Sequence, residues 1–376
     1  MRRFSAFILV VAAGPALASG QYLGKGSTLS YAPTELGSAS SLPAAGAGLD
    51  GSIVWEQKFQ GPNWVIRDLS LGDSQTVFAV AELGRVLTTS DGGETWTVSI
   101  NLGFPYYWYG VHAFDSQTAI ISGFNNSTSA GLFRWTFDGG NTWSDAQVLQ
   151  GIGWPTRALF VDDQIGMIAD LSLAGIHYTS TGGLQAEDWG FVQADPTGGW
   201  LQGNFTLLPD GNAWIAGISF CHSLDYGASW DCRHSVDPVF DGGGVSFPDL
   251  EHGWVAGGSI SPTVEGWVHR TTDGGETWSD RILRAPFPIR SLLFLDASLG
   301  FAVGGNIYSG VGGIFSTADG GDTWTLDLDA SFEMSAIKAL QTSETTFDLW
   351  AAGYSGGPSF TGRIYKAQVS LPAASK

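Results

Sequence analysis

Three arginines are candidates for an anion-binding site in a chain that is otherwise poor in basic residues. Arg67, Arg157 and Arg290 belong to a set of only 17 Lys and Arg residues among 376, against 36 Asp and Glu. A guanidinium donates paired hydrogen bonds to a carboxylate, sulfate or phosphate, so three converging arginines would hold such a group. Each could instead pair with a neighbouring acid such as Asp68 or Asp162, and the sequence leaves both interpretations open.

A second candidate is the densest aromatic cluster of the chain, Tyr106-Tyr107-Trp108-Tyr109. Aromatic rings fill protein cores, and they also stack on sugar rings or contact partner proteins. Both roles are open here. We therefore define one candidate ligand face from the arginines and three of these aromatic residues: Arg67, Arg157, Arg290, Tyr107, Trp108 and Tyr109.

Catalytic and metal chemistry cannot be assigned from spacing. The six histidines are scattered without metal-ligand spacing, and the chain has no Gly-x-Ser-x-Gly elbow, P-loop or dinucleotide fingerprint. We therefore expect no metal and no cofactor, and catalytic residues, if there are any, are unknown. Several acids near expected inner strands could supply a glycosidase pair: Asp68, Asp162, Asp163, Asp241 and Glu333.

A repeated turn must position these residues, and its clearest copy is TTDGGETW at Thr271–Trp278. One copy is degraded and has Thr181 at the aspartate position. Successive copies are separated by 47, 43, 44, 48 and 46 residues, which is the length of a four-stranded propeller blade. Five copies keep both the aspartate and the tryptophan: Asp91 and Trp96, Asp138 and Trp143, Asp225 and Trp230, Asp273 and Trp278, and Asp319 and Trp324.

The chemistry of the repeat predicts a structural role for these aspartates and tryptophans. The carboxylate can accept backbone N–H bonds within a hairpin turn, and the glycines supply positive φ. The tryptophan opens the outgoing strand as a large apolar anchor.

This motif resembles the Asp-box, or BNR repeat, of sialidases, sortilin-type receptors and photosystem II assembly and stability factors. The segments GWVAGG at Gly253–Gly258 and GFAVGG at Gly300–Gly305 most resemble the photosystem II assembly and stability factors. The resemblance covers nearly everything after residue 50. It implies a propeller with the boxes on its outer edge, a ligand face around the central channel, and a non-enzymatic binding or assembly function.

A carbohydrate-active enzyme of the Asp-box glycosidase type is the alternative that the resemblance leaves open. Sialidases use three arginines for a substrate carboxylate, but Trp64-Val65-Ile66-Arg67-Asp68 departs from their Phe-Arg-Ile-Pro motif. Enzymatic activity is therefore uncertain; if present, we expect a glycoside hydrolase.

The C-terminal end of the chain predicts how the ring closes. Residues 336–341, 347–353 and 362–369 supply three strands of a last blade that lacks its fourth, and Ser52–Phe59 is a spare strand at the start. Pairing them predicts an all-β, seven-bladed propeller of four-stranded antiparallel blades over residues 51–370, followed by a tail at 371–376. Such closure protects the exposed edge of the last sheet.

The N-terminal residues predict a secretory route. Met1-Arg2-Arg3, the apolar run Phe4–Ala13 and Ala16-Leu17-Ala18 fit a signal peptide over residues 1–18. Residues 19–50 are rich in Ser, Ala and Gly, as in a linker, although they also resemble the second part of a two-part plastid leader. We expect a secreted protein, or alternatively one of the thylakoid lumen, and no later stretch is long and apolar enough to span a membrane.

The remaining predictions concern covalent modification and partners. Cys221 and Cys232 flank the box SLDYGASW, so a disulfide across that hairpin is plausible in an oxidising compartment. The net charge of −19 disfavours nucleic acid. We expect a monomer that binds a protein or a carbohydrate at the channel face. Asparagine sequons make three glycosylation candidates: Asn125, Asn126 and Asn204.

Overall fold

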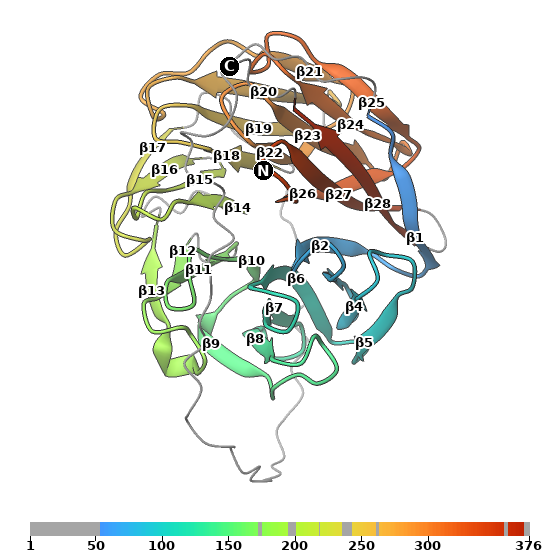
Figure 1. Ribbon diagram of the computed structural model, residues 1–376. Coiled ribbons are helices and arrows are strands. Elements are labelled where there is room, and N and C mark those ends of the chain that lie inside the picture. Colours follow the sequence, from blue (N-terminus) through green and yellow to red (C-terminus); the bar gives the residue numbers. More distant parts are fainter. Residues whose placement is uncertain are drawn as a thin grey trace, which may run out of the picture. The chain divides into compact units, whose positions relative to one another are not determined.

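The computed structural model describes residues 53–171, 175–194, 201–217, 219–234, 243–260, 263–356 and 360–371 (Figure 1). These residues form seven four-stranded antiparallel sheets, the blades of a propeller. The predicted signal peptide and linker lie outside them. Within these ranges no helix is long and apolar enough to cross a membrane. The predicted fold class is confirmed.

The strands follow in chain order, four to a blade. Blade 1 contains β2 (Ile66–Leu71), β3 (Val77–Ala81), β4 (Arg85–Thr89) and β5 (Thr97–Asn101); blade 2 contains β6 (Tyr106–Ala113), β7 (Ala119–Asn125), β8 (Ala130–Thr136) and β9 (Gln147–Ile152). Blade 3 contains β10 (Pro155–Phe160), β11 (Gly166–Asp170), β12 (Gly175–Thr179) and β13 (Gly190–Gln193), with the 3-10 turn η1 (Ala186–Asp188) before β13. Blade 4 contains β14 (Leu201–Leu207), β15 (Ala213–Gly217), β16 (Ser219–Ser223) and β17 (Asp231–His234). Blade 5 contains β18 (Gly244–Ser246), β19 (Gly253–Ser259), β20 (Glu265–Thr271) and β21 (Leu283–Ala285). Blade 6 contains β22 (Ile289–Phe294), β23 (Gly300–Asn306), β24 (Val311–Thr317) and β25 (Thr325–Ala330); blade 7 contains β26 (Glu333–Gln341), β27 (Thr346–Ser355), β28 (Thr361–Ser370) and β1 (Glu56–Pro62).

The first strand of each blade lies innermost, and these inner strands form a closed ring. Each contacts the inner strand of the next blade, and β26 of blade 7 contacts β2 of blade 1. The second strands are packed between neighbouring blades, so they are runs of small and apolar residues such as the fully buried VFAVA of β3. Large rings fill the space between blades; the ring of Trp254, for example, stacks on that of Phe294 at 3.6 Å.

The termini close the ring as predicted, because β1 pairs antiparallel with β28. The register runs from Glu56 opposite Lys366 to Pro62 opposite Thr361. Figure 1 shows the N-terminal strand lying beside the last strands of the chain. The expected boundaries are shifted: β1 spans Glu56–Pro62, and all three C-terminal strands are longer than expected.

Each Asp-box is a turn tied together by its own side chains. In the first box, Oδ1 of Asp91 accepts the backbone N–H of Thr95 at 2.9 Å and the hydroxyl of Thr89 at 2.7 Å, while Oδ2 accepts the hydroxyl of Thr95 at 2.6 Å. The equivalent bonds are present at Asp138, Asp225, Asp273 and Asp319. Gly93 has a φ of +88° and no room for a Cβ, which would lie 2.9 Å from the ring of Trp350.

A second repeated turn, which the sequence analysis missed, lies beside five of the six copies of the box. Oδ1 of Asp73 accepts the backbone N–H groups of Gln75 and Thr76 between β2 and β3. Gly92 of the adjacent box then donates its N–H to the carbonyl oxygen of Gln75 at 2.8 Å. Equivalent caps occur at Asp115, Asp162, Asp249 and Asp296. We call this end of the blades the box end.

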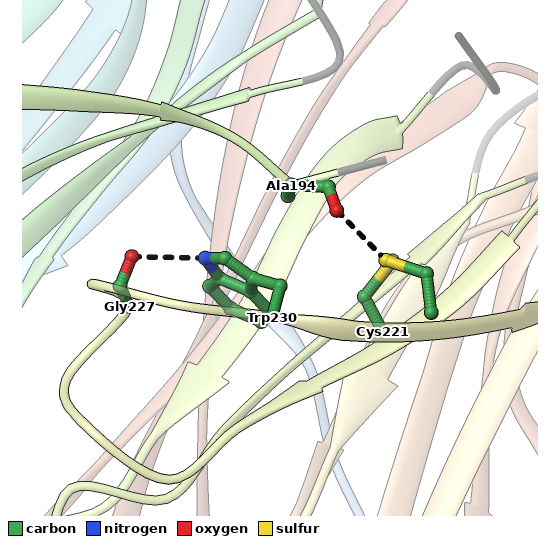
Figure 2. The surroundings of a disulfide bond; sticks show 5 residues. Ala194, Cys221, Gly227 and Trp230 are labelled. Atoms are coloured by element: carbon green, nitrogen blue, oxygen red, sulfur yellow. Dashed lines mark hydrogen bonds between the residues drawn. A yellow bond between two sulfur atoms is a disulfide. The ribbon is translucent and has the colours of Figure 1, made fainter. Parts of the chain in front are cut away.

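The disulfide joins Cys221 on β16 to Cys232 on β17, which lie opposite each other in the sheet. Figure 2 shows the bond beside Trp230, whose Nε1 donates to the carbonyl oxygen of Gly227 at 2.9 Å. The sulfur of Cys232 lies 3.0 Å from the carbonyl oxygen of Ala194, so the bond also contacts blade 3.

Candidate functional site

The candidate ligand face lies at the end of the blades opposite the boxes, which we call the mouth end. Because strands alternate in direction, the turns between second and third strands lie there, together with the connections that enter each inner strand. Arg67, Tyr109, Arg157 and Arg290 all lie near the start of an inner strand.

All four of these residues lie at a β-bulge in an inner strand. The register between first and second strands shifts across Arg67, Tyr109 and Arg290, and across the pair Thr156-Arg157. A bulge adds a residue that has no direct partner on the neighbouring strand, and it changes the direction of the side chain. The four residues therefore occupy equivalent bulge positions in blades 1, 2, 3 and 6.

Arg67 is ion-paired at the mouth end. Its Nε donates to Oε1 of Glu82 at 3.0 Å, and its Nη2 is also paired with that oxygen. Its Nη1 donates to the phenolic oxygen of Tyr354 at 3.1 Å. The guanidinium carbon lies 5.2 Å from the ring centres of both Tyr109 and Tyr354, within the range of cation–π attraction.

Arg290 is joined to the same network through Glu333. Its Nη2 lies 2.8 Å from Oε2 of Glu333, and Tyr354 donates its hydroxyl to Oε1 of Glu333 at 3.1 Å. Burial raises the pKa of Tyr354, so its hydroxyl stays protonated and remains a donor. Arg67 and Arg290 therefore belong to one chain of contacts that also contains two acids, Glu82 and Glu333.

Arg157 is separate from that network. Its Nη2 lies 3.6 Å from Oδ1 of Asp68, a buried acid on β2. The three arginines do not form one cluster: each has an acidic neighbour, and the contacts through Tyr354 and Glu333 link Arg67 to Arg290. Asp162, the other acid considered as a partner, caps its own turn at the box end.

The aromatic residues of β6 form a stack that reaches the surface. The rings of Tyr107 and Tyr109 both stack on Phe124 of β7, at 5.2 and 5.6 Å between centres. Phe124 in turn stacks on Trp154 at 5.3 Å, and 45% of the Trp154 surface is exposed. Burial raises the pKa of Tyr109. We call Tyr107, Tyr109, Phe124 and Trp154 the aromatic stack.

Trp108 is not part of the candidate surface. Its side chain is fully buried in the core between blades 1 and 2, with Phe78 and Val111 among its neighbours. Because side chains alternate along a strand, Trp108 points away from the direction of Tyr107 and Tyr109. Its role is packing.

Large apolar side chains are exposed at both ends of the blades. Among the residues that the structure describes, eight lie at the mouth end and four lie in turns at the box end, namely Phe137, Leu184, Leu224 and Leu250. Five others lie near the start of outer strands or before β1: Val54, Val98, Val148, Phe191 and Leu326. Tyr308 and Phe104 are the most exposed of the eight, at 82% and 65%. We call these eight residues the apolar rim: Leu102, Phe104, Trp154, Ile260, Val264, Tyr308, Val311 and Phe360.

The glycosylation candidates differ in placement. Asn126 is exposed in the turn between β7 and β8, at the mouth end. The side chain of Asn125 accepts the N–H of Ser127 at 2.9 Å and holds that turn. Asn204 lies on the inner strand β14.

Sequence reasoning missed the partners that complete the site. Tyr354 lies on β27 and Glu82 follows β3, and neither was considered, whereas Glu333 was considered only as a possible catalytic acid. Lys338 on β26 was also missed. These residues are hard to identify from the sequence, because a single tyrosine or lysine on a strand has no distinguishing pattern. Their contacts form only when the ring of blades closes.

No protein-family model and no curated protein matches this sequence. Among solved structures, one described as YCF48 bound to D1 peptide is similar, with 18% identity over 86% of this chain and 99% of that chain and a TM-score of 0.57. A GH74 xyloglucanase from Xanthomonas campestris is similar at 12% identity over 80% of this chain and 53% of that chain, with a TM-score of 0.57. U3-55K has 11% identity over 85% of this chain and 100% of that chain, with a TM-score of 0.60. At such identities the likeness shows a shared propeller fold and does not identify an activity.

Proposed function

We propose that this protein is a non-enzymatic binding propeller of the assembly type, and that it holds a segment of a partner protein at its mouth end. The aromatic stack carries the proposal, because it ends on the exposed ring of Trp154 within the apolar rim. Rigid aromatic rings give large contact areas at a low cost in side-chain entropy. The fold likeness to YCF48 bound to D1 peptide supports a polypeptide partner.

The charge balance of the site favours a partner segment with exposed apolar side chains. Arg67 and Arg290 are each paired with an acid, Glu82 and Glu333, so neither guanidinium faces the partner as an isolated charge. The ion pairs also restrain the side chains around the stack. We therefore expect contact area and shape to dominate recognition at this face.

The alternative function is a secreted carbohydrate-active enzyme. The fold likeness to a xyloglucanase supports it, and an exposed tryptophan can stack on a sugar ring. Hydrolysis requires a carboxylic acid that protonates the glycosidic oxygen. Glu333 is poorly suited to that role, since it is buried and its two oxygens are engaged by Tyr354 and Arg290. The geometry at Glu333 therefore does not support its use as that acid.

We also propose a secretory-route location, with the thylakoid lumen as the alternative. The disulfide between Cys221 and Cys232 supports an oxidising compartment.

Photo-crosslinking from the mouth end tests the function. A benzophenone amino acid replaces Trp154 in one variant and Leu250 in a control variant, because these side chains are similarly exposed, at 45% and 48%, on opposite ends of the blades. After irradiation in the source extract, position 154 should crosslink to one defined polypeptide segment and position 250 should not. Equal labelling from both positions, or release of sugar from xyloglucan by the purified protein, would contradict the proposal.

A further inference from the structure

Three charged side chains from three inner strands lie together near the axis of the propeller, and His112 on a fourth strand is close enough for its pKa to be affected by one of them, Lys338. Asp68 lies on β2, His112 on β6, Arg157 on β10 and Lys338 on β26. Both Arg157 and Lys338 are neighbours of Asp68, although β10 and β26 are not adjacent in the ring. We call these residues the axial cluster, and the proposed partner-binding function does not use it.

The geometry of the cluster leaves two cations facing one carboxylate oxygen. Oδ1 of Asp68 lies 3.6 Å from Nη2 of Arg157 and 3.6 Å from Nζ of Lys338. A charge-assisted hydrogen bond is shorter, about 2.7–2.9 Å. That shorter length is seen in this protein where one cation faces one acid, as for Lys366 and Asp348 at 2.9 Å. In the described part of the chain, neither cation of the cluster has a nearer acid.

Within the axial cluster, the acid is more deeply buried than the two cations. The side chain of Asp68 is 1% exposed, and its Oδ2 accepts the backbone N–H of Val111 at 3.4 Å. Arg157 and Lys338 keep 14% and 23% of their side-chain surfaces exposed. The acid is therefore covered by protein, while the two cations are mostly buried and keep a small exposed surface.

The third basic side chain does not alter the charge balance. Burial, together with the charge of Lys338, lowers the pKa of His112 to about 3, so His112 is neutral at pH 7. Two cations and one acid then leave one positive charge among the inner strands. Charge in a poorly solvated environment is costly unless it is paired.

We infer that Arg157 and Lys338 together bind a small monovalent anion, chloride or a free carboxylate such as acetate, on the solvent side of Asp68. The anion supplies the missing negative charge and accepts hydrogen bonds from the guanidinium and the ammonium. Asp68 holds the two cations in place and weakens the site by its own charge.

The protonation of Lys338 makes this binding dependent on pH. Burial and the nearby Arg157 lower the pKa of Lys338 to about 8, against the opposing effect of Asp68. The ammonium is therefore present below about pH 8 and is lost above it, whereas Arg157 stays charged and His112 stays neutral. Anion affinity should fall as the pH rises from 7 to 9.

Chloride-35 NMR tests the site on the whole chain, with sodium chloride as the probe and sodium acetate as the competitor. Bound chloride broadens the line, and acetate should reverse the broadening. Lys338→Met should weaken chloride binding at least tenfold. The matched control is Lys366→Met, which removes a lysine of similar exposure, 21%, from a one-to-one pair on the same blade; its chloride affinity should equal that of the wild type.

Two further measurements keep the inference testable if Lys338→Met fails to fold. Broadening by the wild-type protein should decrease between pH 7 and 9, and in Asp68→Asn this decrease should occur at lower pH, because Asp68 helps to keep Lys338 protonated. The inference is overturned by acetate-insensitive broadening, by equal affinities of the two lysine variants, by broadening that does not change with pH, or by a decrease in Asp68→Asn at the same or a higher pH than in the wild type. Partner crosslinking from position 154 is independent of all these results.

Discussion

The hydroxyl of Tyr354 donates to Oε1 of Glu333 at 3.1 Å. The same oxygen of Tyr354 accepts a bond from Arg67, and Glu333 pairs with Arg290, so one phenol joins two arginines that lie more than 200 positions apart. The link spans β2, β22, β26 and β27, and therefore couples blades 1, 6 and 7 where the ring closes. The two arginines are therefore linked through protein side chains.

Replacing Tyr354 with Phe should destabilise the protein, because the buried Oε1 of Glu333 loses its donor. Hydrogen bonds to charged groups contribute about 1.5–3 kcal/mol, and we expect a loss in that range in the free energy of unfolding. Urea unfolding followed by fluorescence measures it. Tyr308→Phe, at a position that is 82% exposed, is the control and should be neutral. Equal stability of Tyr354→Phe and wild type would contradict the network.

The Asp-boxes should make stability depend on pH in the acid range. Hydrogen bonds from Thr271 and Thr277 lower the pKa of Asp273 from its ordinary 3.8 to about 2. A carboxyl group whose pKa is lower in the folded state stabilises the fold above its unfolded pKa, and this contribution is lost as the pH falls through the folded pKa. Thermal midpoints should therefore drop between pH 4 and 2. Asp273→Asn should lower the midpoint at pH 7 and flatten this dependence; an unchanged pH profile would contradict the assignment.

Asp327 on β25 should make stability depend on pH in the opposite direction. Burial raises its pKa to about 6, and a hydrogen bond from Ser316 only partly offsets this. An acid whose pKa is raised by folding costs stability when it ionises, so stability should decrease as the pH rises from about 4 to 6. Asp327→Asn should raise the thermal midpoint at pH 7 and leave it nearly unchanged at pH 4. A lower midpoint at pH 7 would show that the carboxylate is needed.

Removing the disulfide should lower the free energy of unfolding, mainly because the unfolded chain gains conformational entropy. Cys221 and Cys232 are 11 residues apart, and a loop of that size contributes about 3 kcal/mol at most. Urea unfolding of the Cys221→Ala, Cys232→Ala double variant should show a loss up to this size. Dithiothreitol should destabilise the wild type but not the variant; equal sensitivity of both would indicate an effect unrelated to this bond.

The sequence predicted the blades well because the box chemistry is local. Asp273, its glycines and Trp278 lie within a few residues of one another, so their spacing alone predicts a turn and a blade. The mouth end depends on closure instead: Arg67 and Tyr354 are 287 positions apart and meet only in the folded ring. Trp108 shows the same limit, since composition cannot distinguish the buried ring from its neighbours Tyr107 and Tyr109. The sequence singled out the three arginines, but it could not show which acids lie beside them.

The central claim, that a partner segment binds at the aromatic stack, is tested most directly by titration calorimetry with the segment identified by crosslinking. The account predicts that Trp154→Ala weakens binding at least tenfold while Leu250→Ala, at a similarly exposed position on the box end, binds like the wild type. Circular dichroism verifies that both variants fold. Equal affinities of the two folded variants would contradict the account and move the binding surface away from the mouth end.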